Sequence, residues 1–125
     1  MKILLTTLVA LVLAPAAANR SYTATTWAAG CTSAFCGSAS DTGGSGLLRV
    51  EVSIVQQVTG SYWDGTAFSS ASEVFVPATG TSSWRYAFPA TSFPAVGSYV
   101  VRARSTDAAG NTGNPSTPRT FNLTP

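Results

Sequence analysis

One segment, residues 97–111 (GSYVVRARSTDAAGN), constrains the fold of this 125-residue chain more than any other. Its side chains alternate between two faces of an extended chain: Tyr99, Val101 and Ala103 on one face, and Val100, Arg102 and Arg104 on the other. A period of two is typical of a strand that is buried on one face and turns charged side chains to water on the other. We therefore expect a central strand that begins at Gly97 and ends in a turn made by Asp107, Gly110 and Asn111.

The same alternation recurs along the chain and predicts an all-β protein. The core-facing residues that it predicts are Leu48, Val50, Val52, Ile54, Val74, Val76, Trp84, Tyr86, Phe88, Phe121 and Leu123. Pro77 places the strand predicted over 73–78 at a sheet edge, because proline has no N–H to give to a neighbouring strand. About seven or eight strands at this spacing predict a two-layer antiparallel β-sandwich.

An Asp-Gly pair at Asp64 and Gly65 lies between apolar residues and predicts a β-hairpin. The hairpin gathers three aromatic residues, Tyr62, Trp63 and Phe68. If their rings are exposed together they can stack on sugars, which makes them a candidate surface for surface glycans. We favour the alternative, in which they cover the edge of the sandwich, because Tyr and Trp bury large apolar bodies while their polar tips stay hydrated.

Residues 1–18 have the pattern of a secretory signal, with a basic start, an apolar run over 3–14 and small residues at Ala16 and Ala18. The apolar run is too short to cross a bilayer, so we expect no permanent membrane span. Residues 19–125 are then long enough for a single domain. The alternative is that 8–13, followed by Pro15, are retained as the first strand of the sandwich.

A further alternative follows if the first strand is retained. The segment could leave its own domain and complete the sheet of a neighbouring copy, which would link copies into a fibre. The candidate exchanged residues are Leu8, Val9, Ala10, Leu11, Val12 and Leu13.

Cys31 and Cys36 are the two cysteines of the chain and are close enough in sequence to close a small loop. We predict a disulfide, because a metal site would need further ligands and the chain has no histidine and no third cysteine. A disulfide and an export signal both indicate an oxidising compartment, so we expect a secreted or cell-surface protein.

Three pieces of the sequence resemble bacterial immunoglobulin-like (fibronectin type III-like) surface modules. They are the Gly-x-Tyr strand that runs into Asp107–Asn111, the Tyr-Trp turn of 62–65, and Asp41 followed by a glycine-rich turn and the strand over 50–54. The resemblance covers most of residues 22–123 and departs from the family at the first strand. It implies an immunoglobulin-like sandwich, a tyrosine-corner role for Tyr99, a non-enzymatic adhesive or structural function, and neighbouring modules of the same kind as partners. Such modules usually occur in series, which leaves open whether this chain is a whole protein or a fragment.

The charged residues give little support for catalysis or nucleic-acid binding. The chain has no histidine to act as a base, and its net charge of +2 is spread without a basic run. We therefore expect no enzyme, no nucleic-acid partner and no cofactor, with calcium as the exception to test. Asp41, Asp107 and Asn111 are its candidate ligands, since loops at a sandwich end can supply hard oxygen atoms. The alternative is that these residues cap turns.

Three functions remain: a structural or adhesive surface module, a fibre subunit joined by strand exchange, and a carbohydrate-binding module. We favour the first.

Overall fold

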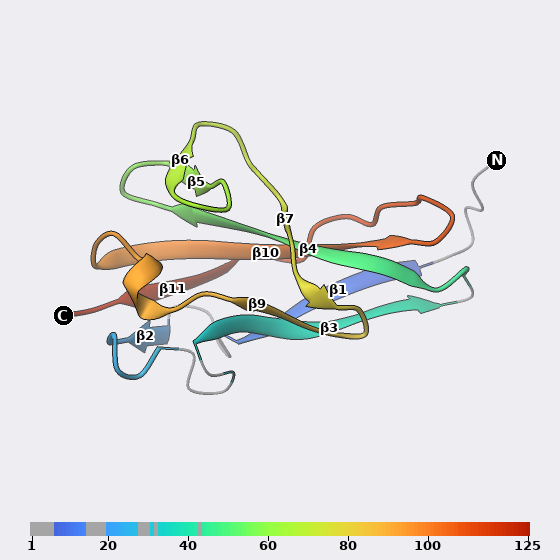
Figure 1. Cartoon of the computed structure of the whole chain (residues 1–125), viewed down its shortest axis with the longest axis horizontal. Helices are drawn as coiled ribbons and strands as arrows, with labels where there is room; N and C mark the ends of the chain where they lie inside the picture. The colour runs from blue at the N-terminus through green and yellow to red at the C-terminus, as the bar shows by residue number, and fades with distance from the viewer. Residues whose placement is uncertain (1–6, 15–19, 28–30, 32, 43) are drawn as a thin grey trace.

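The computed structural model describes residues 7–14, 20–27, 31, 33–42 and 44–125. Apart from one short 3-10 turn, η1 (Ala90–Ser92), all the regular elements of these residues are strands. The strands form two sheets that pack face to face (Figure 1). The predicted all-β, two-layer sandwich is therefore confirmed.

The first sheet has four antiparallel strands. Their order is β1 (Thr7–Ala14), β3 (Ala34–Thr42), β9 (Ser83–Ala87) and β8 (Thr79–Gly80). β1 therefore lies at one edge of this sheet, and β3 is the strand to which it is hydrogen-bonded.

The second sheet contains the long central strand. Its order is β2 (Arg20–Tyr22), β11 (Arg119–Leu123), β10 (Gly97–Asp107), β4 (Leu47–Gln56), β5 (Ser61–Trp63) and β6 (Phe68–Ser70), with β7 (Val76–Pro77) also paired to β4. All pairs are antiparallel except β2 with β11. β10 lies between β11 and β4, so the central strand predicted from its alternation is confirmed. The two- and three-residue strands are too short to show a period, which is why the sequence indicated fewer strands.

Aromatic rings fill the space between the sheets. Trp27, Phe35, Phe88, Tyr99 and Phe121 are each at most 5% exposed, and the indole of Trp27 stacks on the ring of Phe121 with centroids 5.1 Å apart. Offset and edge-on contacts of this kind add to the free energy gained by burying apolar surface. The hydroxyl of Tyr99 donates to the carbonyl oxygen of Ala95 at 2.7 Å, which confirms the predicted tyrosine corner.

The prediction for Leu48 is wrong, because the side chain is 52% exposed. The register of β4 against β10 shifts between Thr106, opposite Arg49, and Asp107, opposite Leu47. This bulge leaves Leu48 without an opposite residue and reverses the alternation at the start of β4. Leu47 packs against the core in its place.

The strand predicted over 73–78 is confined to Val76 and Pro77. Residues before it lie over the outer face of the second sheet, where Glu73 pairs with Arg102 and the ring of Phe75 lies 3.9 Å from the guanidinium carbon of Arg104. The two arginines lie on the outer face of β10, as predicted, and these contacts partly cover them. These contacts replace the strand pairing that the alternation predicted.

Candidate functional sites

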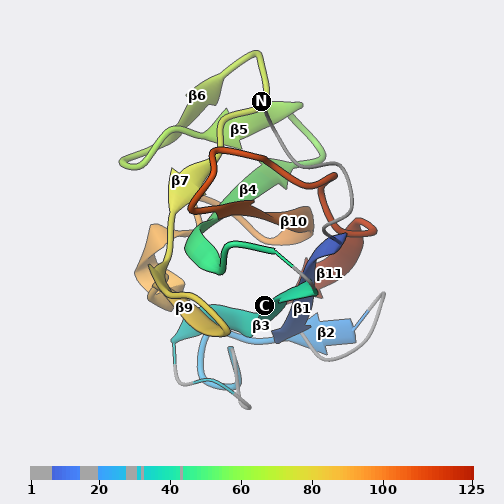
Figure 2. The same cartoon turned by 90° about the vertical axis from the view of Figure 1, so that its right-hand side faces the viewer.

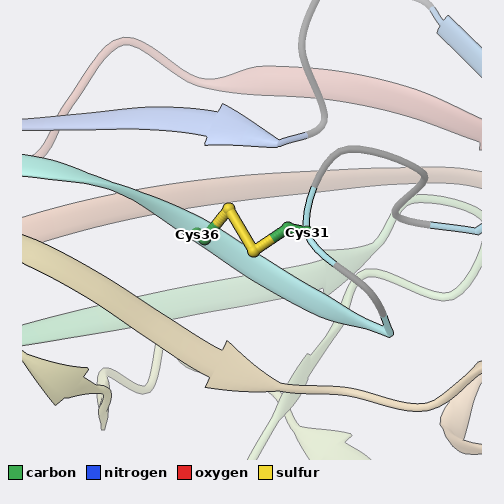
Figure 3. Close-up of a disulfide and its surroundings, with 2 residues drawn as sticks. All are labelled: Cys31 and Cys36. Atoms are coloured by element: carbon green, nitrogen blue, oxygen red, sulfur yellow. A yellow bond between two sulfur atoms is a disulfide. The ribbon is translucent and has the colours of Figure 1, made fainter.

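The two cysteines form a disulfide, as predicted (Figure 3). Their Cα atoms are 6.3 Å apart. Cys36 lies on β3, where it is opposite Ala14 of β1 and Arg85 of β9. The disulfide therefore ties the loop before β3 to the end of the β1 pairing, and it leaves no free thiol in the chain.

Asp107 closes the turn that follows β10. Its carboxylate accepts hydrogen bonds from the backbone N–H groups of Ala109 and Asn111 and from the side-chain amide of Asn111, at 2.8 to 3.0 Å. The bond from the Asn111 side chain, helped by the backbone bonds, lowers the pKa of Asp107 although burial opposes it. Gly110 has a φ of +89°, a conformation that suits glycine and completes the turn. Asp107 and Asn111 therefore bind one another in a closed turn.

Asp41 lies near the end of β3, just before the loop that leads to β4. One carboxylate oxygen accepts from the N–H of Gly46 at 2.9 Å, and the other is buried with no hydrogen-bond partner among the described residues. The carbonyl of Gly46 accepts in turn from the N–H of Ala108 at 2.9 Å. The structure thus brings the two predicted loops together at one end of the sandwich.

The geometry of these loops is that of turn capping. Both oxygens of Asp107 already accept N–H groups, and the amide of Asn111 is turned toward Asp107. No group of three His, Cys, Asp or Glu side chains lies close enough to hold a metal ion within the described part of the chain. A calcium site at Asp41, Asp107 and Asn111 stays a prediction.

The aromatic hairpin does not form the exposed platform that sugar stacking requires. Trp63 is only 8% exposed, and its ring packs on Phe68 and Phe88 with centroids 5.2 and 4.9 Å away. Its indole N–H donates to the hydroxyl of Tyr86 at 2.8 Å, and Tyr86, which was predicted to face the core, is half-buried. Tyr62 is half-buried on the other side of the strand. The interpretation in which the rings cover the sandwich edge therefore describes Trp63 and Phe68.

The remaining acidic side chains also have partners. Asp64 accepts from Thr66, Ala67 and Ser69 within the hairpin turn, and the bond from Ser69 is the main cause of its lowered pKa. Glu51 accepts from Arg104 at 3.1 Å. Glu73 accepts from Ser53 and Arg102. The sequence gives no signal for the cluster of Ser53, Glu73 and Arg102. Ser53 and Arg102 are 20 and 29 positions away from Glu73, and they meet it only when the chain folds back over the sheet.

The segment over 8–13 lies within β1. In β1, Ala10 and Val12 are 4% and 3% exposed and belong to the core, whereas Val9, Leu11 and Leu13 are 37%, 49% and 55% exposed. The strand packs across the sandwich against β10 and lies beside β3 (Figure 2). Cleavage after residue 18 stays a prediction, but it would remove a strand that this structure contains.

Gly37 explains how closely β1 approaches β3. A Cβ atom at this position would lie 1.8 Å from the carbonyl oxygen of Leu11 and 2.6 Å from the ring of Trp84. No larger residue fits without moving the backbone of β1. Sequence reasoning missed Gly37, because its requirement appears only once the partner strand is placed.

The edge of β1 that faces away from β3 lies against Gly113 at Leu8 and borders a groove. The groove has a volume of about 390 Å³ and is lined by residues 8–12 of β1 and by residues 114–117 and Arg119 from the chain before and at the start of β11. Val9, Leu11 and Leu13 are apolar, and β1 carries none of the charged or proline residues that usually protect a sheet edge.

Searches for related proteins give a fold and no family. No protein family model matches the chain, and no curated protein matches it. Among solved structures, CopC from Methylosinus trichosporium OB3b is similar, with a TM-score of 0.52 and 19% sequence identity over 94% of this chain and 95% of CopC. None of the described residues forms a helix long and apolar enough to cross a membrane.

At this level of identity the similarity concerns the arrangement of strands alone. Three observations support the same fold. They are the two face-packed sheets, the tyrosine corner at Tyr99 and the similarity to CopC over nearly the whole of both chains. The chain is an all-β protein with an immunoglobulin-like β-sandwich fold.

Proposed function

We propose that this chain is a non-enzymatic structural module of an oxidising compartment, secreted or at the cell surface, and that it joins other copies through β1. The first part is supported by one observation: the carboxylates and thiols of the chain are already bound to other groups within the fold. All five acidic residues bind backbone or side-chain groups within the fold, both cysteines form the disulfide, and the chain has no histidine. A hydrolytic or acid–base mechanism would need at least one such group placed against a substrate.

The lack of histidine and of a free thiol also matters for metal binding. Copper and zinc favour imidazole and thiolate ligands, and this chain offers neither imidazole nor a free thiol. A resident site for these metals is therefore not part of the proposed function.

The second part rests on the position of β1. Among the described strands it is an edge strand that pairs with β3 alone, and its two core residues are small or medium-sized side chains. A β1 strand from another copy would make the same hydrogen bonds to β3 and bury the same Ala10 and Val12. Exchange of an identical element keeps the native contacts and is a low-cost route to assembly.

A mixed disulfide tests this exchange. Leu11 and Ser38 are directly opposite in the β1–β3 register, and neither is buried in the core. We would prepare Leu11→Cys and Ser38→Cys chains, mix them at high concentration and oxidise them gently. Exchange predicts a disulfide-linked heterodimer in non-reducing electrophoresis and intact mass spectrometry, because the register places the two thiols side by side when β1 of one chain enters the sheet of the other.

The control is Ser40→Cys, which is opposite Val9 and two residues from the matched position. Exchange in register predicts a much lower yield of heterodimer with Leu11→Cys for this variant. Equal yields from Ser38→Cys and Ser40→Cys, or no heterodimer with either, would contradict joining through β1.

A further inference from the structure

A second cavity lies on the outer face of the other sheet, away from β1. Its volume is about 320 Å³. Tyr62 of β5 is opposite Val55 of β4, and Val55 is opposite Val100 of β10, so the three residues form one row across the sheet. This row and Pro118 supply the apolar part of the cavity lining.

The polar part of the lining comes from the adjacent row. Ser53 of β4 is opposite Arg102 of β10, and Glu73 lies over both. Glu73 accepts from the Ser53 hydroxyl at 2.6 Å and from Nε of Arg102 at 3.0 Å, and its other oxygen pairs with Nη2 of Arg102. A two-bond arginine–carboxylate pair of this kind has a fixed geometry.

The ion pair retains capacity to bind a ligand. The side chains of Arg102 and Glu73 are 31% and 24% exposed, so they are neither fully buried nor freely solvated. A guanidinium group has five N–H donors, and Glu73 takes two of them. Donors and carboxylate lone pairs therefore lie side by side, next to an aromatic ring and two aliphatic side chains.

The ion pair and the apolar row together restrict the kind of ligand that can bind in this cavity. A free anion would meet the charge of Glu73, and a free cation would meet the charge of Arg102. A wholly apolar molecule would remove water from the ion pair without replacing its hydrogen bonds, which costs free energy. A pyranose ring has one C–H face for Tyr62 and the valines, and neighbouring hydroxyls that both donate and accept.

We propose that this cavity binds a neutral pyranose unit, with its C–H face on Tyr62, Val55 and Val100 and two neighbouring hydroxyls on Glu73 and Arg102. This site differs from a platform on Trp63, because Trp63 is buried and Tyr62 lies on the opposite side of β5. The cavity contains no residue of β1, so the sugar-binding proposal can be tested separately from the joining of copies.

Titration of the whole ¹⁵N-labelled chain by NMR tests the proposal. The probes are the methyl glycosides of glucose, galactose, mannose and N-acetylglucosamine, with methyl glucuronide as a charged comparison. We expect saturable shifts for at least one neutral glycoside, with Kd of order 1 mM as suits a single sugar unit in a small site. The shifts should be centred on residues 53–55, 62 and 100–102.

Matched variants decide whether the cavity is responsible. Arg102→Gln and Tyr62→Ala should each weaken binding at least tenfold. Arg104→Gln and Phe75→Ala remove an arginine and an aromatic ring from the same outer face, outside the cavity lining, and should leave Kd unchanged. The amide spectrum of each variant reports whether it is folded.

Three results would overturn the proposal. One is the absence of saturable shifts for every neutral glycoside with the native chain. Another is tighter binding of methyl glucuronide than of all the neutral sugars. The third is an equal loss of binding in Arg102→Gln and Arg104→Gln.

Discussion

At the scale of single residues, polar side chains in this chain mostly hold turns and strands in place. Asp107 is the clearest case, because it is fully buried and still accepts three N–H groups. A carboxylate with these partners keeps its charge to a lower pH than a free aspartate does. Its role in the fold can therefore be measured through the pH dependence of stability.

Asp107→Asn should lower the free energy of unfolding at neutral pH, because the amide cannot accept all the N–H groups around it. The folded pKa of Asp107 lies below the unfolded value of about 3.9. The contribution of the carboxylate is therefore complete above about pH 5, and it is lost as the pH falls through the folded pKa. Urea unfolding from pH 7 to pH 2.5 should show the two chains converging below about pH 4. A constant difference down to pH 2.5 would show that the charge of Asp107 is not involved.

The two aromatic neighbours Tyr62 and Trp63 should behave differently. Trp63→Ala removes a buried ring that contacts Phe68 and Phe88 and should cost about 3–5 kcal/mol of unfolding free energy. Tyr62→Ala removes a half-buried ring and should cost about 1 kcal/mol. Chemical denaturation of both variants measures the difference, and equal losses would place Trp63 outside the core.

At the scale of elements, alternation predicted the long strands well. Tyr99, Val101 and Phe121 are buried as their spacing required, because a period of two is visible over several residues. The same reasoning failed at Leu48, where one bulge reverses the faces, and over 73–78, where Glu73 and Phe75 contact Arg102 and Arg104 and only Val76 and Pro77 pair as a strand. These outcomes depend on a partner strand, which no local pattern contains.

The candidate sites were less predictable than the strands. The disulfide followed from the count and spacing of cysteines, and the meeting of the Asp41 and Asp107 loops followed from their places at strand ends. The sequence could not predict how exposed the hairpin aromatics are, because Tyr and Trp occur both in cores and on surfaces. The cavity at Glu73 and Arg102 depends on a chain reversal that leaves no mark in the sequence.

Gly37→Ala tests the close packing of β1 on β3. The added methyl group would meet the carbonyl oxygen of Leu11 and the ring of Trp84, so β1 must shift away. Overpacking of this kind should cost about 1–3 kcal/mol of unfolding free energy. Ser38→Ala, one residue along β3, serves as the control and should change stability little. Thermal unfolding of both variants provides the measurement, and a fully native melting temperature for Gly37→Ala would contradict the placement of β1.

At the scale of the whole molecule, an aromatic core joins the two sheets, and one disulfide closes the short loop at the start of β3. Breaking the disulfide in a Cys31→Ser, Cys36→Ser double variant should lower the free energy of unfolding by about 2 kcal/mol, the value for closing a very short loop. Urea unfolding of the native chain with and without reductant should give a similar difference. No change in either experiment would mean that the loop before β3 is held by other contacts.

Thr7–Ala14 forms the first strand of the sandwich, and we propose that the fold of β3 requires it. Hydrogen exchange of β3 (Ala34–Thr42), read by mass spectrometry, tests this dependence in the native chain and in a chain that begins at Asn19. We predict slow exchange along β3 in the native chain, fast exchange in the shortened chain, and restored protection when a peptide of residues 7–14 is added. Equal protection of β3 with and without residues 1–18 would contradict the account.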